Sequence, residues 1–187
     1  MSRRKEAMGC LRPPLGKTTM PKRLPDRWRP ECIQEFRASA KQRFQDALIL
    51  ATEDRRTGAI YLWGYCAEML LKAAYFSVIG VSETATITWG GDLSPAIDRG
   101  KNIFKISWPN NGKGHNVRAW SELLVQERIS QGVPFENPFA LQVQNRGLVI
   151  GQLWSETLRY HKNVAYSHEA RRVREAAEWL LANSVEL

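Results

Sequence analysis

The hydrophobic positions are most concentrated in residues 57–78, which read TGAIYLWGYCAEMLLKAAYFSV. This stretch holds no proline and is apolar on nearly every side of a helix, and a helix of that kind belongs in the middle of a bundle. Thr57 is suited to cap its N-terminus, and Gly80 is suited to end it. The pattern therefore predicts a buried central helix over Thr57–Val78.

Other segments repeat apolar residues at helical spacing, and none alternates in the way of a strand. They span about Pro30–Asp54, His115–Gly132, Pro138–His161 and Ser167–Asn183. Pro30 suits a first helical turn, and Asn116 and Ser167 suit N-caps. Together with the central helix, these segments predict an all-α fold, an antiparallel bundle of about five helices.

Residues 80–114 form a long connection between the second and third of these helices. Ser94-Pro95 suits the start of one short helix within it. A connection of this length in a compact domain often serves as a lid or binding loop, and a plain surface excursion is the alternative. Trp89 and Trp108 are the tryptophans of this loop that we consider for contact with a ligand.

One narrow stripe of the central helix is polar. At helical spacing it carries Tyr61, Tyr65, Glu68 and Lys72. A carboxylate and an ammonium group are costly to bury unless they are paired and hydrogen-bonded. The stripe therefore predicts either a structural network that fixes the helices or a functional site.

The charge of the chain is unevenly distributed. The formal net charge is +8, and residues 1–29 hold nine basic residues against two acidic ones. This segment is also rich in proline, so we predict a disordered basic tail followed by a helical domain over 30–187. The tail could hold RNA in a salt-sensitive way, or it could simply keep the protein soluble. Met20 is an alternative start that would remove five of the basic residues.

Composition also bears on where the protein works. The longest apolar stretch is interrupted by Glu68 and Lys72, which makes it a poor membrane span. No apolar segment typical of a secretion signal follows the basic opening. The chain has three cysteines in no paired spacing, as expected of reduced thiols. We therefore predict a cytoplasmic protein that does not associate with membranes.

The sequence lacks the short motifs of several enzyme classes. It contains no phosphate loop, no dinucleotide fingerprint, no HExxH and no GxSxG. His115, His161 and His168 do not sit with carboxylates at metal-ligand spacing on one helix. We therefore predict no metal site and no cofactor.

Several segments in a fixed order resemble the HEPN family of helical domains. They are GAIYLWGYCAEMLLKAAYF, then GHNVRAWSELL, then LRYHKN, and a last helix ending EAAEWLLANS. Members of the family often read A-x-Y-L-x-G-Y-x-x-E-x-x-L-K-A, then G-H-[DN]-L-x-x-L, then RY before a final helix with A-x-x-W-L. The resemblance covers about residues 35–184 and implies a bundle of four to five helices.

The resemblance also implies several functions. HEPN domains occur as metal-independent RNA-cleaving toxins, as partners of minimal nucleotidyltransferases, and as non-catalytic modules that bind RNA or a nucleotide. A nucleotidyltransferase or an antitoxin is therefore an expected class of partner. Such domains are often dimeric, and we predict a homodimer here. Gly147 and Gly151 share a helix face on which a second copy could pack closely. Packing within one bundle explains these glycines equally well.

Catalytic members of the family carry an arginine, usually followed by a polar residue, and then a histidine after four to six intervening residues. In this chain Arg159 is followed by His161, which is too near, and by His168, which is too far. The nearest match runs from Lys162 to His168, with lysine in place of arginine. Lysine is a point charge and makes no bidentate phosphate contact. If the chain is a ribonuclease, these four residues are its catalytic candidates.

The function that we predict first is a non-catalytic binding module for nucleic acid, a nucleotide or a protein partner, and the ribonuclease is the alternative. The polar stripe of the central helix could face residues near the ends of the next two helices. The candidate ligand-binding residues are Tyr61, Tyr65, Glu68, Lys72, His115, Arg159 and Tyr160. Tyrosines offer faces for stacking with bases, while Arg159 and Lys72 could contact phosphate. A buried pair of Glu68 with Lys72 or with Arg159, which would only hold the bundle in register, explains the same residues.

Overall fold

The computed structural model describes residues 23–24, 29–108 and 114–187, so most of the predicted basic tail lies outside the described residues. The described part of the chain is helical. Its α-helices are α1 Ile33–Thr52, α2 Arg56–Val78, α3 Ser94–Asn102, α4 Val117–Ser130, α5 Asn137–Leu153 and α6 Ser167–Ala182. A π-helical turn, η2 Trp89–Leu93, precedes α3, and a 3₁₀ turn, η3 Glu156–Tyr160, follows α5. The prediction of an all-α bundle is confirmed.

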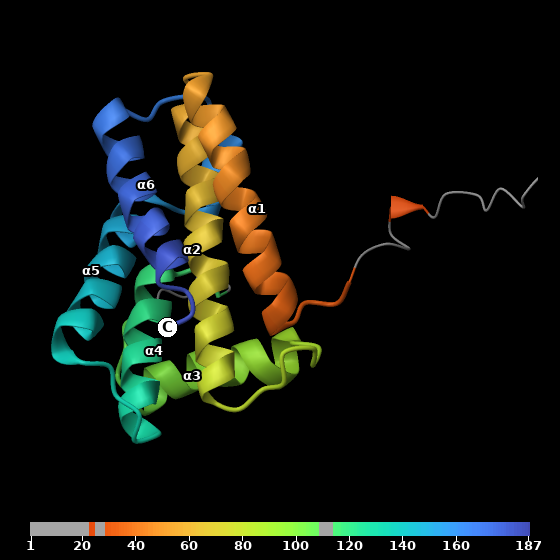
Figure 1. The fold of residues 1–187 in the computed structure, drawn as a ribbon, viewed down its shortest axis with the longest axis vertical. Coiled ribbons are helices and arrows are strands. Elements are labelled where there is room, and N and C mark those ends of the chain that lie inside the picture. The colour runs from red at the N-terminus through yellow and green to blue at the C-terminus, as the bar shows by residue number, and fades with distance from the viewer. Residues whose placement is uncertain (1–22, 25–28, 109–113) are drawn as a thin grey trace, which may run out of the picture.

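Helix α2 is the centre of the bundle, as its apolar sequence predicts. It packs against α1, α4 and α6, and it also contacts η3 (Figure 1). Trp63, Leu71 and Phe76 are fully buried along it. A helix with neighbours on so many sides gains stability from apolar residues on all of them, which is why it lacks the usual polar face. No helix in the described ranges is both long and apolar enough to cross a membrane.

Helices α1 and α2 form an antiparallel pair joined by a short link (Figure 1). Helix α1 begins at Ile33, not at Pro30, and its N-cap is Cys32, whose Sγ accepts the N–H of Glu35 at 3.5 Å. Helix α2 begins at Arg56, so the prediction of Thr57 as its N-cap is wrong. Thr57 is buried, and its hydroxyl is used in a tertiary contact described below.

The predicted long loop between the second and third helices has secondary structure of its own. It holds η2 and α3, and α3 begins at Ser94 as the Ser94-Pro95 signal predicted. In Figure 1, α3 lies across the lower end of the bundle. Two backbone hydrogen bonds tie this segment to the start of α1: Ile87 N–H to Glu31 O at 2.7 Å, and Gln34 N–H to Glu83 O at 3.0 Å.

Helix α5 ends earlier than predicted, at Leu153 and not at His161. The cause is Trp154, which is extended and packs its ring directly over Gly64 of α2. A Cβ on Gly64 would lie 2.0 Å from the Trp154 ring, so only glycine allows this approach. The chain then makes the η3 turn, which carries Arg159 and Tyr160.

The two glycines of α5 serve packing inside the bundle. A Cβ on Gly147 would meet the Ser121 Oγ of α4 at 2.0 Å, and one on Gly151 would meet the Arg118 Cβ at 3.0 Å. Of the two explanations that the sequence left open, close packing of α5 on α4 is the one the geometry provides. These glycines therefore give no argument for a second copy of the chain.

Helix α6 begins at Ser167, with Tyr166 at the N-cap position in place of the predicted Ser167. The Glu169 carboxylate accepts the N–H of Tyr166 at 2.8 Å and so satisfies one of the free donors at this end. In Figure 1, α6 and α2 both begin at the upper end of the bundle. The apolar side of α6, including Val173, Ala177 and Leu180, is buried.

Candidate functional site

The polar stripe of α2 is built around Glu68, which is buried with 2% of its surface exposed. Its carboxylate forms an ion pair with Lys72, one helical turn later on the same face. It also accepts a hydrogen bond from His115, whose Nδ1 lies 3.0 Å from Oε2 and 3.1 Å from Oε1. The buried Glu68–Lys72 pair that the sequence suggested is therefore formed, and the alternative pair with Arg159 is not.

The ammonium group of Lys72 is enclosed in the bundle. Besides its pairing with Glu68, Nζ lies 5.5 Å from the ring centroid of Trp120, in cation–π contact. Lys72 is buried, so its charge serves the carboxylate and is not available to phosphate from solvent. The expectation that Lys72 contacts phosphate is therefore wrong.

Aromatic rings cover this ionic pair on its outer side. Tyr65 lies edge-on to His115 at 5.7 Å between ring centroids, to Tyr61 at 4.9 Å and to Trp154 at 5.3 Å. The Trp154 indole donates its N–H to the Tyr61 carbonyl at 3.0 Å. Burial, followed by a hydrogen bond with Tyr61, raises the pKa of the Tyr65 hydroxyl. The Tyr65 hydroxyl therefore remains neutral under physiological conditions.

Arg159 and Tyr160 complete the arrangement from η3. The guanidinium of Arg159 lies 4.7 Å from the Tyr160 ring centroid. Its hydrogen bonds with Tyr160 and then with Tyr61 raise its pKa above the ordinary arginine value. Arg159 is exposed, and Tyr160 shows 74% of its surface to solvent. A permanent cation and an aromatic face are thus both accessible.

All of the candidate ligand-binding residues therefore lie together, as the sequence suggested. We call five of them the aromatic surface: Tyr61, Tyr65, His115, Arg159 and Tyr160. Glu68 and Lys72 lie beneath it. Trp154, which was not among the candidate residues, supports the surface through its contact with Tyr65 and its position just before η3. A glycine in the interior of an apolar helix, Gly64, was the signal that a large ring approaches there.

Of the four ribonuclease candidates, His161 and Lys162 lie elsewhere, next to the start of α2. His161 and Lys162 line an open hollow of about 350 Å³ together with Arg55 and Leu50. His168 is exposed in the first turn of α6, and its ring is stacked on Tyr166 at 5.8 Å between centroids. Arg159 belongs to the aromatic surface and does not line this hollow.

Asn163 is the polar residue that follows Lys162 in the family-like motif, and its amide is used to fix the chain. Its Oδ1 accepts the Thr57 N–H at 3.0 Å, and its Nδ2 donates to the Asp54 carbonyl at 2.7 Å. The Thr57 hydroxyl in turn accepts the N–H groups of Val164 at 2.8 Å and Ala165 at 3.0 Å. This contact explains why Thr57 is not a helix cap.

The two loop tryptophans differ in their surroundings. Trp89 is exposed, whereas Trp108 is buried with its ring edge-on to Trp120 at 5.2 Å. Trp108 is therefore a core residue, and the expectation that it meets a ligand is wrong. Among the residues described, no cluster of three or more His, Cys, Asp or Glu side chains is arranged to hold a metal ion.

Models of protein families, curated proteins and solved structures were compared with this chain, and none matches it. The function must therefore be argued from the surface itself.

Proposed function

We propose that this chain is a non-catalytic, HEPN-like module that binds single-stranded RNA at the aromatic surface. The observation that carries the proposal is the exposed pair of Arg159 and Tyr160, held over the half-buried rings of Tyr61 and Tyr65. Single-stranded nucleic acid is bound in this way by many proteins, with bases stacked on aromatic rings and phosphates near arginine.

The buried ion pair explains why such a surface would be preorganised. The Glu68 carboxylate is paired with Lys72 and accepts a hydrogen bond from Nδ1 of His115, which fixes the orientation of the ring. The other ring nitrogen, Nε2, can then form a hydrogen bond with a base edge or a ribose hydroxyl. Tyr65 contacts the same ring at 5.7 Å, so stacking and hydrogen bonding are offered side by side.

The second function implied by the resemblance is RNA cleavage. Three observations favour the binding module over it. Asn163 is occupied by Thr57 and Asp54. Lys162 occupies the position at which catalytic members of the HEPN family have arginine. His168 is stacked on Tyr166 and does not line the hollow of His161. A nucleotidyltransferase or antitoxin partner remains a prediction of the resemblance.

The test is fluorescence anisotropy of a labelled single-stranded RNA with the full chain, in the presence of a metal chelator. We expect binding that Arg159→Ala weakens several-fold, because a charge-assisted phosphate contact is lost. Arg118→Ala is the matched control, since Arg118 is an exposed arginine of α4 outside the aromatic surface. The basic tail is the same in both variants, so their difference reports on the surface alone.

The same samples separate the two functions. Electrophoresis should show intact RNA. Equal binding by the two arginine variants would refute the aromatic surface as the RNA site. Cleavage in chelator that disappears in His161→Ala or His168→Ala would instead establish the ribonuclease.

A further inference from the structure

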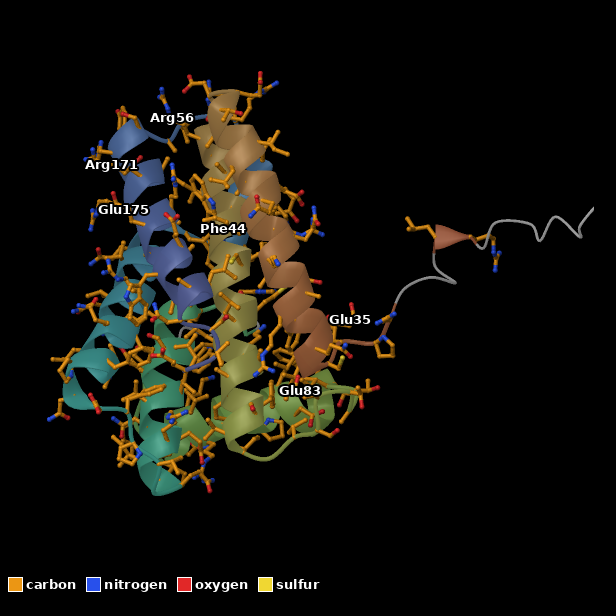
Figure 2. All side chains as sticks on the ribbon, viewed as in Figure 1. Glu35, Phe44, Arg56, Glu83, Arg171 and Glu175 are labelled. Carbon is orange, nitrogen blue, oxygen red and sulfur yellow. The ribbon has the colours of Figure 1, made fainter. Side chains whose placement is uncertain are left out.

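A second site candidate lies at the upper end of the bundle, where α1 ends and α2 and α6 begin. It is a hollow of about 300 Å³ lined by Arg56, Arg171, Arg174, Trp63 and Ser167, with two alanines completing its wall. Figure 2 labels Arg56 and Arg171 at this end, on α2 and α6 respectively. Trp63 lies on the opposite face of α2 from the stripe of Tyr61, Tyr65, Glu68 and Lys72, so this hollow is separate from the aromatic surface.

The lining of the hollow carries an excess of positive charge. It includes three arginines, and none of its described lining residues is acidic. Arg56 pairs with Asp54 at 2.6 Å, and Arg174 has Glu178 at 3.8 Å, but neither carboxylate lines the hollow. Arg171 makes no ion pair with any residue that the structure describes. Guanidinium groups gathered in this way suit a ligand with several anionic oxygens.

The start of α6 adds to the positive electrostatic potential of the hollow. Ser167 is the first residue of a 16-residue helix and lines the hollow. The helix dipole is positive at this end. The Glu169 carboxylate takes the N–H of Tyr166, which leaves the next backbone N–H groups of the first turn without a partner within the helix. Such an end is a common binding place for phosphate.

An independent observation comes from the inner wall. The Trp63 side chain is 1% exposed, and its indole nitrogen is a buried donor without a hydrogen-bond partner among the described residues. Buried donors nearly always have a hydrogen-bond partner, so the unpaired indole N–H of a residue in the wall of a hollow requires an explanation. Trp63 lines the hollow, so a ligand there would lie next to the residue that carries this unsatisfied donor.

We propose that this hollow binds a phosphate monoester dianion, presented by a small molecule or supplied as free inorganic phosphate. Three guanidinium groups and a helix N-terminus match the charge and the oxygens of a dianion better than those of the singly charged diester of a nucleic-acid backbone. The volume of about 300 Å³ admits the phosphate together with a small attached group. This site does not depend on the proposed RNA-binding function.

Isothermal titration of the full chain tests the proposal, with inorganic phosphate, adenosine monophosphate and sulfate as separate probes at one ionic strength. We expect saturable binding of a phosphate probe that Arg171→Ala weakens by about tenfold or more, the loss of a charge-assisted contact. Arg172→Ala is the matched control, because Arg172 is the next residue of α6, exposed and not part of the lining. Trp63→Phe, which keeps an aromatic wall without the N–H, should also weaken binding.

The probes distinguish the sources of the phosphate. Equal affinity for both phosphate probes assigns the site to the phosphate group alone, and tighter binding of the nucleotide assigns it to a monoester. Absence of binding at millimolar concentration, equal loss in the two arginine variants, or sulfate bound as tightly as phosphate would overturn the proposal. Folding of each variant is checked by its melting temperature, and Arg171→Ala changes only an exposed side chain.

Discussion

Two glutamates are buried among the residues that the structure describes, and their surroundings differ. Glu127 of α4, 1% exposed, receives Nε of Arg99 at 2.6 Å, Nη2 of Arg99 at 3.1 Å and the Gln131 amide at 3.0 Å. Glu68 of α2, 2% exposed, receives Lys72 and the imidazole of His115. Glu127 is thus held by two hydrogen bonds from one guanidinium group and by an amide. Glu68 is held by the ammonium group of a flexible side chain and by an imidazole ring.

This difference separates a structural carboxylate from one that supports a site. The Arg99–Glu127 pair ties α3 to α4, and Arg99 also contacts Ser130 and the ring of Phe104. The Glu68 network reaches outward through half-buried His115 to rings that are open to solvent. A buried charge alone therefore does not mark a functional site; the exposed groups that it positions do.

The largest effect on stability is expected at Glu127. We expect Arg99→Ala to lower the free energy of unfolding by about 3–5 kcal/mol, because it leaves a buried carboxylate without its cation. Urea denaturation measures this. Arg118→Ala, which breaks the exposed Arg118–Glu122 pair, should cost less than about 1 kcal/mol. Similar losses in both variants would contradict the structural role of the Arg99–Glu127 pair.

Around the aromatic surface, stability should depend most on the close packing of the Trp154 ring over Gly64. Gly64→Ala places a methyl group 2.0 Å from the Trp154 ring. We expect a loss of about 1–3 kcal/mol from overpacking, and a weaker affinity for RNA because η3 is displaced. Gly90→Ala is the control, since a Cβ there meets nothing within 4 Å. A stable variant that binds RNA normally would show that Trp154 does not hold the aromatic surface.

Removing the cation of the Glu68 network should cost less than removing Arg99. In Lys72→Met, His115 still donates to the carboxylate, and we expect a loss of about 1–3 kcal/mol. Adding Glu68→Leu should recover much of it, because an apolar replacement of a whole buried pair is often neutral. Urea denaturation of the single and double variants gives the comparison. A larger loss in Lys72→Met than in Arg99→Ala would reverse the ranking.

The charge of Glu127 can also be detected through Tyr75, which lines the same hollow as Arg99 and Glu127. Burial first, and then the charge of Glu127, raise the pKa of Tyr75 to about 12. Because the folded-state pKa is raised, the resulting stability is present below the unfolded pKa of about 10 and is lost as pH rises toward 12. Relative to Tyr75→Phe, the unchanged protein should lose about 1 kcal/mol between pH 9 and pH 11. Parallel pH profiles would contradict this.

The smallest effect on stability is expected at the outermost ring. Tyr160→Ala should change the free energy of unfolding by less than about 0.5 kcal/mol, because the side chain is exposed. It should nevertheless weaken RNA binding by roughly 5- to 100-fold, the range of one lost base-stacking contact. Tyr166→Ala removes another exposed tyrosine, 67% accessible, and should leave RNA affinity unchanged. Equal effects of the two variants would assign the RNA site to another surface.

The sequence predicted those features that depend on local periodicity. The apolar run of α2 marked the central helix, and the spacing of Tyr61, Tyr65, Glu68 and Lys72 marked one face of it. The end of α5 was missed because the apolar period continues through Trp154 and Leu158, and only the contact of Trp154 with Gly64 breaks the helix. Thr57 was missed as a tertiary contact because its type and position also suit a cap.

Charged residues were harder to interpret from the sequence. Arg56, Arg171 and Arg174 appear as ordinary solvated positions along α2 and α6, and only the packing of the two helices brings them to one hollow. Arg99 and Glu127 lie on different helices, so no spacing links them. Pairings between distant segments are set by tertiary structure and leave no local pattern.

Cross-linking tests the central claim most directly, because it reports the position of bound RNA without any substitution. Single-stranded RNA is bound to the full chain, irradiated with ultraviolet light, and the cross-linked residues are identified by mass spectrometry. The aromatic surface predicts cross-links at Tyr160, with Tyr61 or Tyr65 as second positions. Cross-links confined to residues 1–29, or to Tyr166 and Trp89, would contradict it.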